Sequence, residues 1–149
     1  MAHLFELFVA EWLQAHLPAE LRLDIQDSIQ LGEEHSFRFV VDLSLVEPSG
    51  RCLAVLDTKY KKDSSPSPDD VAQVVTYALA KEAKTAILVY PSPLGIPFRA
   101  EIGGISVRTM SFRTDVDLEG SGSDFLQQVL NAVKDSGVVG SKADLLEIP

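Results

Sequence analysis

The spacing of hydrophobic residues along the chain shows two different periods. Across residues 2–16, apolar side chains recur every three or four positions, which predicts a helix that ends before Pro18. Across residues 21–31, apolar and polar side chains alternate, which predicts one strand, or two short strands with a bend near Asp27. Both periods occur within one short chain, so we expect a fold that combines helices with a sheet.

Residues 37–62 carry the strongest strand pattern, with two apolar runs on either side of a turn at 47–50. Asp42 lies on one face of the first run, and Asp57 and Lys59 share a face of the second, because side chains alternate along a strand. The residues expected on the opposite face of the first run are Phe37, Phe39, Val41, Leu43 and Leu45. Ionised groups on a buried face need a partner or a metal, so these two carboxylates and the lysine predict a metal site beside a cation.

The second half of the chain begins with a helix signal at Ser67 and Pro68, residues favoured at the cap and at the first helical position. The elements that follow are predicted as a helix to Lys81 or Lys84, a buried strand over 84–90, a loop over 94–103, a strand over 105–112 and a final helix over 124–134. The strand–helix–strand order over 51–90 predicts a parallel crossover. The fold class is therefore α/β, with a mixed sheet between helices.

The spacing of the polar residues in this part of the chain resembles a nuclease family. Asp42 followed by Asp57-Thr58-Lys59 resembles the PD-(D/E)xK nuclease core. The longer string Asp57-Thr58-Lys59-Tyr60-Lys61, with Gln73 and Tyr77 downstream, resembles McrC, the nuclease subunit of McrBC-type restriction systems directed at modified cytosine. The similarity covers roughly residues 4–112 and includes the first helix.

This resemblance implies a restriction-endonuclease-like three-layer core, in which helices flank a mixed β-sheet. Residues 1–114 would form the PD-(D/E)xK nuclease-like core, and residues 115–149 would add a C-terminal helix and an acidic tail to the same domain. The implied activity is a Mg²⁺-dependent DNA endonuclease of a restriction or defence system, with Mn²⁺ as a substitute. Such an enzyme hydrolyses phosphodiester bonds with water that a metal helps to activate.

The resemblance also assigns roles to individual residues. Its implied metal ligands are Glu6, Asp42, Asp57 and the carbonyl of Thr58. Lys59 would point at the attacking water or the scissile phosphate. Gln73 and Tyr77, which share a helix face at a spacing of four, would help to place the lysine and contact the DNA backbone.

Each of these assignments has a structural alternative. Lys59 could simply pair with Asp57 or Asp42 in a strand-end cluster, and Tyr77 could be an ordinary packing residue. Lys61 and Lys62 are candidates for nucleic-acid contact, although a solvated loop explains them equally well. A loose basic set, which could flank a cleft, comprises Arg99, Arg108 and Arg113.

The net charge of −9 is unusual for a protein that holds a polyanion, because phosphate contacts come from lysine and arginine. Residues 115–149 contain seven acidic and two basic residues and so carry much of this excess. We therefore expect the chain alone to bind DNA weakly and a motor or DNA-binding subunit to supply the grip. A homodimer is a further expectation, because double-strand cleavage by a single active site usually needs two copies.

Two other functions remain open from the sequence. The same fold can serve as a catalytically inactive binding or assembly subunit, which the acidic composition favours. RNA or branched DNA can also replace ordinary DNA as the substrate, because substrate choice depends on loops and partners rather than on the fold.

The remaining features favour a cytoplasmic protein. Cys52 is the single cysteine, which excludes an internal disulfide and a cysteine-rich zinc site, and its place on a strand predicts a buried, inert thiol. No apolar run approaches the roughly 20 residues of a membrane helix, and the N-terminus lacks the pattern of a signal peptide.

Overall fold

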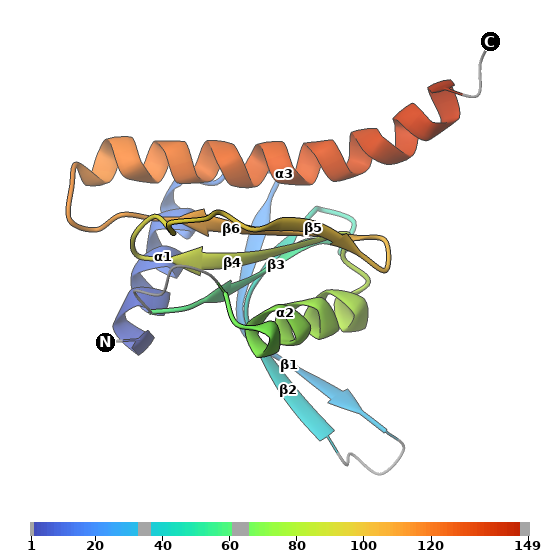
Figure 1. Ribbon diagram of the computed structural model, residues 1–149, viewed down its shortest axis with the longest axis horizontal. Coiled ribbons are helices and arrows are strands. Elements are labelled where there is room, and N and C mark those ends of the chain that lie inside the picture. Colours follow the sequence, from blue (N-terminus) through green and yellow to red (C-terminus); the bar gives the residue numbers. More distant parts are fainter. Residues whose placement is uncertain (1, 33–36, 61–65, 147–149) are drawn as a thin grey trace.

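The computed structural model describes residues 2–32, 37–60 and 66–146, with side chains in the last helix as far as Ser136 (Figure 1). These residues form α1 (Ala2–His16), β1 (Arg22–Leu31), β2 (Phe37–Val46), β3 (Cys52–Thr58), α2 (Pro68–Lys81), β4 (Thr85–Tyr90), β5 (Arg99–Ile102), β6 (Ile105–Ser111) and α3 (Leu118–Leu146). Within this part of the chain, no helix is long and apolar enough to cross a bilayer.

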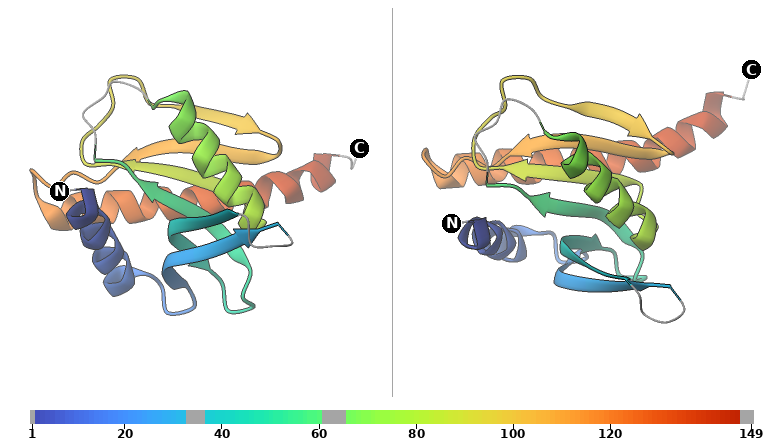
Figure 2. Two further views of the ribbon diagram at one scale, coloured as in Figure 1. Left: turned by 90° about the horizontal axis from the view of Figure 1, so that it is seen from below. Right: turned by 60° about the horizontal axis from the view of Figure 1, so that its bottom comes forward.

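The strands form one mixed sheet in the order β1-β2-β3-β4-β6-β5. β3 pairs with β4, and β4 with β6, in parallel, whereas the other pairs are antiparallel. Helix α2 covers one face of the sheet, and α1 and α3 lie on the other (Figure 2). The α/β class, the three layers expected of a restriction-endonuclease-like core and the parallel crossover through α2 are thereby confirmed.

Two hydrophobic clusters hold these layers together. One joins α1 and α3 to the sheet through buried side chains such as Phe5, Val9 and Phe125. The other joins α2 to the opposite face through Val74 and Ala78. Strand β4 lies between them and is buried along its whole length, as a central parallel strand requires.

The strict alternation expected for the first central strand is wrong. Leu43 and Leu45 pack in the cluster of α1 and α3, whereas Val41 and Phe39 pack in the α2 cluster. The alternate side chains of β2 therefore point to one layer before Asp42 and to the other layer after it, and we describe this as a change of face at Asp42. Strand β1 makes the same change between Ile25 and Ile29 along its length. The two strands stay in register, and Gln26, between the pairs Ile25↔Leu43 and Asp27↔Val41, lies opposite Asp42.

The change of face coincides with an unusual backbone at Gln26, whose φ of 53° is left-handed. A single left-handed residue rotates the following part of a strand, as in a β-bulge, and so shifts which side chains face each layer. Asp42 therefore sits where the strand turns from one face of the sheet to the other.

Two further corrections concern the second half of the chain. The segment over 94–103 was expected as a loop but contains β5, which turns into β6 at Gly103 and Gly104, both at positive φ. Such a Gly-Gly pair is a hairpin signal in its own right. The last helix was expected over 124–134, but α3 begins at Leu118, where Asp117 accepts hydrogen bonds from the backbone of Glu119 and Gly120.

Glycine inside α3 has a packing reason. A Cβ at Gly122 would lie 2.2 Å from Cζ2 of Trp12, so only glycine lets α3 approach α1 this closely. The Trp12 ring is held in turn by stacking on His16 and by an edge contact with Phe112.

We expect Gly122→Ala to lower the free energy of unfolding by about 1–3 kcal/mol, because overpacking outweighs the helix propensity of alanine, which is worth about 1 kcal/mol. Urea denaturation measures the change. In a Trp12→Ala background the same substitution should instead be neutral or stabilising, and an equal loss in both backgrounds would contradict the contact.

Candidate active site

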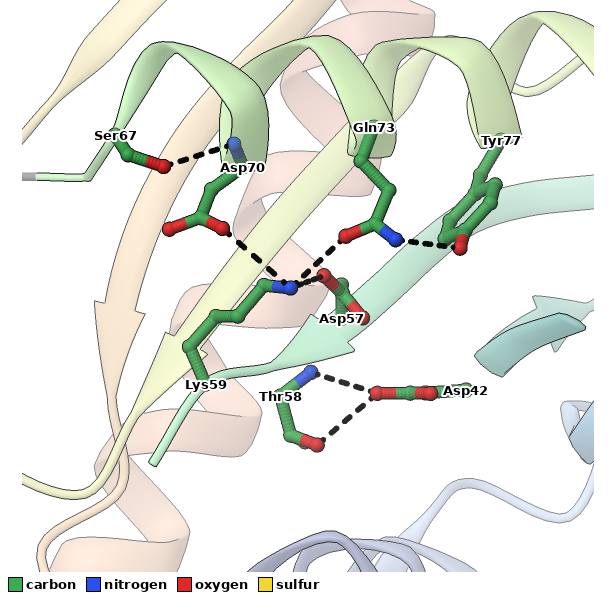
Figure 3. A network of polar contacts seen from close by, with 8 residues as sticks. All are labelled: Asp42, Asp57, Thr58, Lys59, Ser67, Asp70, Gln73 and Tyr77. Carbon is green, nitrogen blue, oxygen red and sulfur yellow. Dashed lines mark hydrogen bonds and ion pairs between the residues drawn. The ribbon is translucent and has the colours of Figure 1, made fainter. Parts of the chain in front are cut away.

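The site begins where β2 and β3 stop pairing. The last pair toward this end is Leu43↔Leu56, so Asp42 and Asp57 come directly after it on adjacent strands. Asp42 Oδ2 accepts hydrogen bonds from the backbone nitrogen and from Oγ1 of Thr58, each 3.1 Å long (Figure 3). The first aspartate is thereby fixed to the end of the strand that carries the second.

Lys59 lies at the centre of a polar network between β3 and α2 (Figure 3). Its Nζ atom lies 2.8 Å from Asp57 Oδ2 and 3.6 Å from Asp70 Oδ1. It also donates a hydrogen bond of 2.9 Å to Gln73 Oε1. Gln73 Nε2 donates in turn to the hydroxyl of Tyr77, again over 2.9 Å.

Helix α2 supplies three of these groups because its first turn is firmly capped. Ser67 Oγ accepts a hydrogen bond from the backbone nitrogen of Asp70, and Pro68 opens the helix, as the sequence predicted. Asp70, Gln73 and Tyr77 follow at helical spacing and so face the end of β3 together.

Helix α1 brings Glu6 to the same place from the other face of the sheet. Glu6 is 8% exposed, and its Oε2 accepts a hydrogen bond from the side-chain amide of Gln26. Burial raises the pKa of Glu6, and the adjoining Asp42 carboxyl raises this pKa further. Because β2 changes face at Asp42, Glu6 can reach the Asp42 carboxyl from the α1 face of the sheet.

Asp57 is the most strongly perturbed acid of the cluster. Burial raises the pKa of Asp57 to about 7, an effect that Lys59 opposes and the nearby Asp42 reinforces. Asp42 thus acts on both of the other acids, and we refer to Glu6, Asp42 and Asp57 together as the carboxyl row. Neighbouring carboxylates repel one another unless a proton or a cation lies between them.

The pKa values of Lys59 and Tyr77 are also shifted by these acids. Burial alone would lower the pKa of Lys59, but the carboxylates of Asp57, Asp70 and Asp42 outweigh it, and the net effect is a raised pKa. Lys59 is therefore a cation at neutral pH. Burial and the charge of Asp57 raise the pKa of Tyr77, whose hydroxyl stays protonated.

The donor set suits a hard divalent cation, because it consists of carboxylate oxygens, the ligands that Mg²⁺ and Mn²⁺ prefer. Asp57 Oδ2 is buried and accepts no well-aligned hydrogen bond from the described residues, so Lys59 balances it only as a nearby charge. Among these residues, no three acidic, histidine or cysteine side chains already surround one point. Binding a metal would therefore require small rotations of side chains now directed at Thr58 and Lys59.

The structure brings together seven of the residues singled out from the sequence. They are Glu6, Asp42, Asp57, Thr58, Lys59, Gln73 and Tyr77. Lys61 and Lys62 lie outside the described residues. Of the basic set, Arg99 and Arg108 face each other across β5 and β6, and Arg113 pairs with Asp115, so none of the three is bonded to the cluster.

Two members of the cluster were not anticipated. The carboxylate of Asp70, in the first turn of α2, reaches Lys59. Asp70 lies three residues before Gln73, so helical spacing already indicated that the two side chains share a face of α2. Gln26 had no comparable signal, because it lies in a different strand and contacts Glu6 only through the fold.

An apolar pocket of about 320 Å³ adjoins the polar cluster. Phe5 and Tyr60, which each neighbour a residue of the cluster in sequence, line it with their rings 6.0 Å apart. The other lining residues are Leu4, Phe8, Thr114 and Leu118.

Comparison with known proteins agrees with the resemblance. Residues 1–91, more than half of the chain, match the McrBC family, described as McrBC 5-methylcytosine restriction system component. The matched region contains every residue of the cluster. No curated protein matches the chain.

We expect the protein to be more stable at pH 5 than at pH 8 in the presence of a chelator. The pKa of Asp57 is raised from 3.8 to about 7 on folding, so the folded state binds the proton more tightly and loses this advantage as pH rises through 7. The difference in free energy of unfolding should be roughly 2 kcal/mol. Chemical denaturation at the two pH values measures it.

Asp57→Asn should remove most of this difference and stabilise the protein at pH 8, because the amide carries no charge to bury. Asp124→Asn is the matched control, since Asp124 is exposed on α3. If Asp57→Asn left the pH dependence as large as in the wild type, the buried carboxyl row would not be its source.

Proposed function

The chain belongs to the family of McrBC 5-methylcytosine restriction system components, and we propose that it is the subunit that cuts DNA, as a Mg²⁺-dependent endonuclease. The observation that carries this proposal is the convergence of Glu6, Asp42 and Asp57 beside Lys59. Three acids and a lysine from α1, β2 and the end of β3, buried or half-buried and close together, are costly for folding. Their chemistry is that of a phosphodiester-cleaving site.

The metal would be held by the carboxylates of Asp42 and Asp57, with Glu6 and the carbonyl of Thr58 as further oxygen ligands. A bound Mg²⁺ supplies charge that helps to activate water and to neutralise the phosphate. The buried Asp57 Oδ2, which Lys59 alone balances among the residues that the structure describes, supports this assignment. So does the crowding of carboxyl groups, which a divalent cation relieves.

Lys59 acts as a fixed positive charge rather than as a base, because its raised pKa keeps it protonated at neutral pH. Gln73 orients it through the hydrogen bond to its Nζ atom, and Tyr77 holds the Gln73 amide in the required direction. With its other N–H groups, Lys59 can donate to the scissile phosphate or to the attacking water. Charge placed in advance of the reaction in this way stabilises the negative charge of the transition state.

The acidic surface supports an active site that works inside an assembly. With a net charge of −9, the chain offers little attraction to DNA by itself. We propose that a partner subunit of the restriction system delivers the DNA, and that two copies of this chain act together when both strands are cut.

The proposal predicts metal-dependent nicking of plasmid DNA that both Asp57→Asn and Lys59→Ala reduce by about 100-fold or more. Asp57→Asn removes a metal ligand, whereas Lys59→Ala removes the fixed charge. Lys84→Ala, at an exposed lysine beyond α2, is the control and should cut as the wild type does. Agarose gels with and without Mg²⁺ or Mn²⁺ give the rates, and parallel reactions with RNA and branched DNA test the substrate class.

The alternative of a non-catalytic assembly subunit predicts a different result. Such a protein would cut none of these substrates, and Mn²⁺ would not raise its melting temperature. Equal cleavage by the wild type and by Asp57→Asn would point to a contaminating nuclease and refute the assignment.

A further inference from the structure

Gln26 has a strained backbone that its own packing does not explain. Among the described non-glycine residues, only Gln26 and Glu82 have positive φ, and Glu82 is the left-handed cap of α2, where such a conformation is common. Gln26 lies inside a strand and is exposed to solvent. A left-handed residue within a strand costs free energy and persists where the surrounding structure or a function requires it.

The strain occurs beside the candidate active site. Gln26 lies opposite Asp42 in the β1–β2 register, at the point where both strands change face. Its side-chain amide donates a hydrogen bond to Oε2 of Glu6. One residue therefore adjoins two of the three acids, Asp42 through the strand register and Glu6 through its side chain.

The side chain that holds Glu6 is a neutral amide rather than a cation. An amide donor fixes the direction of a carboxylate but leaves its negative charge available for a cation, whereas lysine or arginine would neutralise it. At the next position along β1, Asp27 is paired with a cation, Lys81 of α2. At Glu6, the chain instead uses a neutral donor.

We propose that Gln26 is a positioning residue of the metal site, which holds the Glu6 carboxylate beside Asp42 through its side-chain amide. This inference rests on the proposed function. The left-handed backbone at Gln26 serves this purpose, because it sets the position from which the amide reaches helix α1. Partners in the outer shell of a metal site typically change metal affinity or activity by about 10- to 100-fold when removed.

Two substitutions separate the amide from the backbone strain. Gln26→Met keeps the length of the side chain and the strained backbone but removes the donor, whereas Gln26→Gly removes the donor and relieves the strain. The controls are Gln30→Met and Gln30→Gly, at an exposed glutamine of the same strand with an ordinary backbone. The full chain is titrated with Mn²⁺ by electron paramagnetic resonance, and its melting temperature is measured in chelator.

We expect both Gln26 variants to weaken Mn²⁺ binding by about tenfold. Gln26→Gly should at the same time melt at or above the temperature of the wild type, whereas the Gln30 variants should keep full Mn²⁺ affinity. A purely structural residue could not lose metal affinity while stability rises. In a Glu6→Gln background, Gln26→Met should have no further effect, because Gln26 acts through Glu6.

The possible failures are distinguishable. If the wild type binds no Mn²⁺, or if Asp57→Asn does not abolish its Mn²⁺ binding, the proposed function fails and this inference fails with it. If the wild type binds Mn²⁺ through Asp57 but Gln26→Met binds it equally well, only the role of Gln26 is overturned. A further loss of Mn²⁺ affinity when Gln26→Met is added to Glu6→Gln would also overturn the role of Gln26.

Discussion

The repulsion among Glu6, Asp42 and Asp57 is the constraint on which the account of this molecule depends. Burial and mutual proximity raise the pKa of Glu6 and of Asp57, the latter to about 7, so the folded chain holds negative charge at a cost. Lys59 offsets part of that cost, and Gln73 and Asp70 hold Lys59 in place. A site built only for stability would not need three acids, and the divalent cation that we propose would give the arrangement a purpose.

The fold creates this crowding by bringing opposite layers to one point. Glu6 comes from a helix on one face of the sheet, and Lys59 reaches toward a helix on the other. Asp42 adjoins both of them, because β2 changes face at this residue, opposite the left-handed Gln26. The long helix α3 supports the arrangement from behind, where Gly122 allows it to pack closely on α1. Strain and close packing thus serve the geometry of one site.

Much of this structure could be predicted from local patterns. The alternation around Asp57 and Lys59 and the cap at Ser67 specify a strand end and a helix start, and these place Gln73 over the lysine. The change of face at Gln26 could not be predicted, because glutamine has no preference for left-handed backbone and only the completed sheet imposes it. The hairpin at Gly103 was missed although its glycine pair is a recognised turn signal.

The most direct test of the central claim is a crystal structure with Mn²⁺ and its anomalous signal. The account predicts a peak in contact with the carboxylates of Asp42 and Asp57, with Glu6 turned toward it and Lys59 still bonded to Gln73. A structure at saturating Mn²⁺ without a peak there, and with Lys59 still paired to Asp57, would contradict it. The carboxyl row would then be a structural cluster, and the chain would serve its restriction system without cutting DNA.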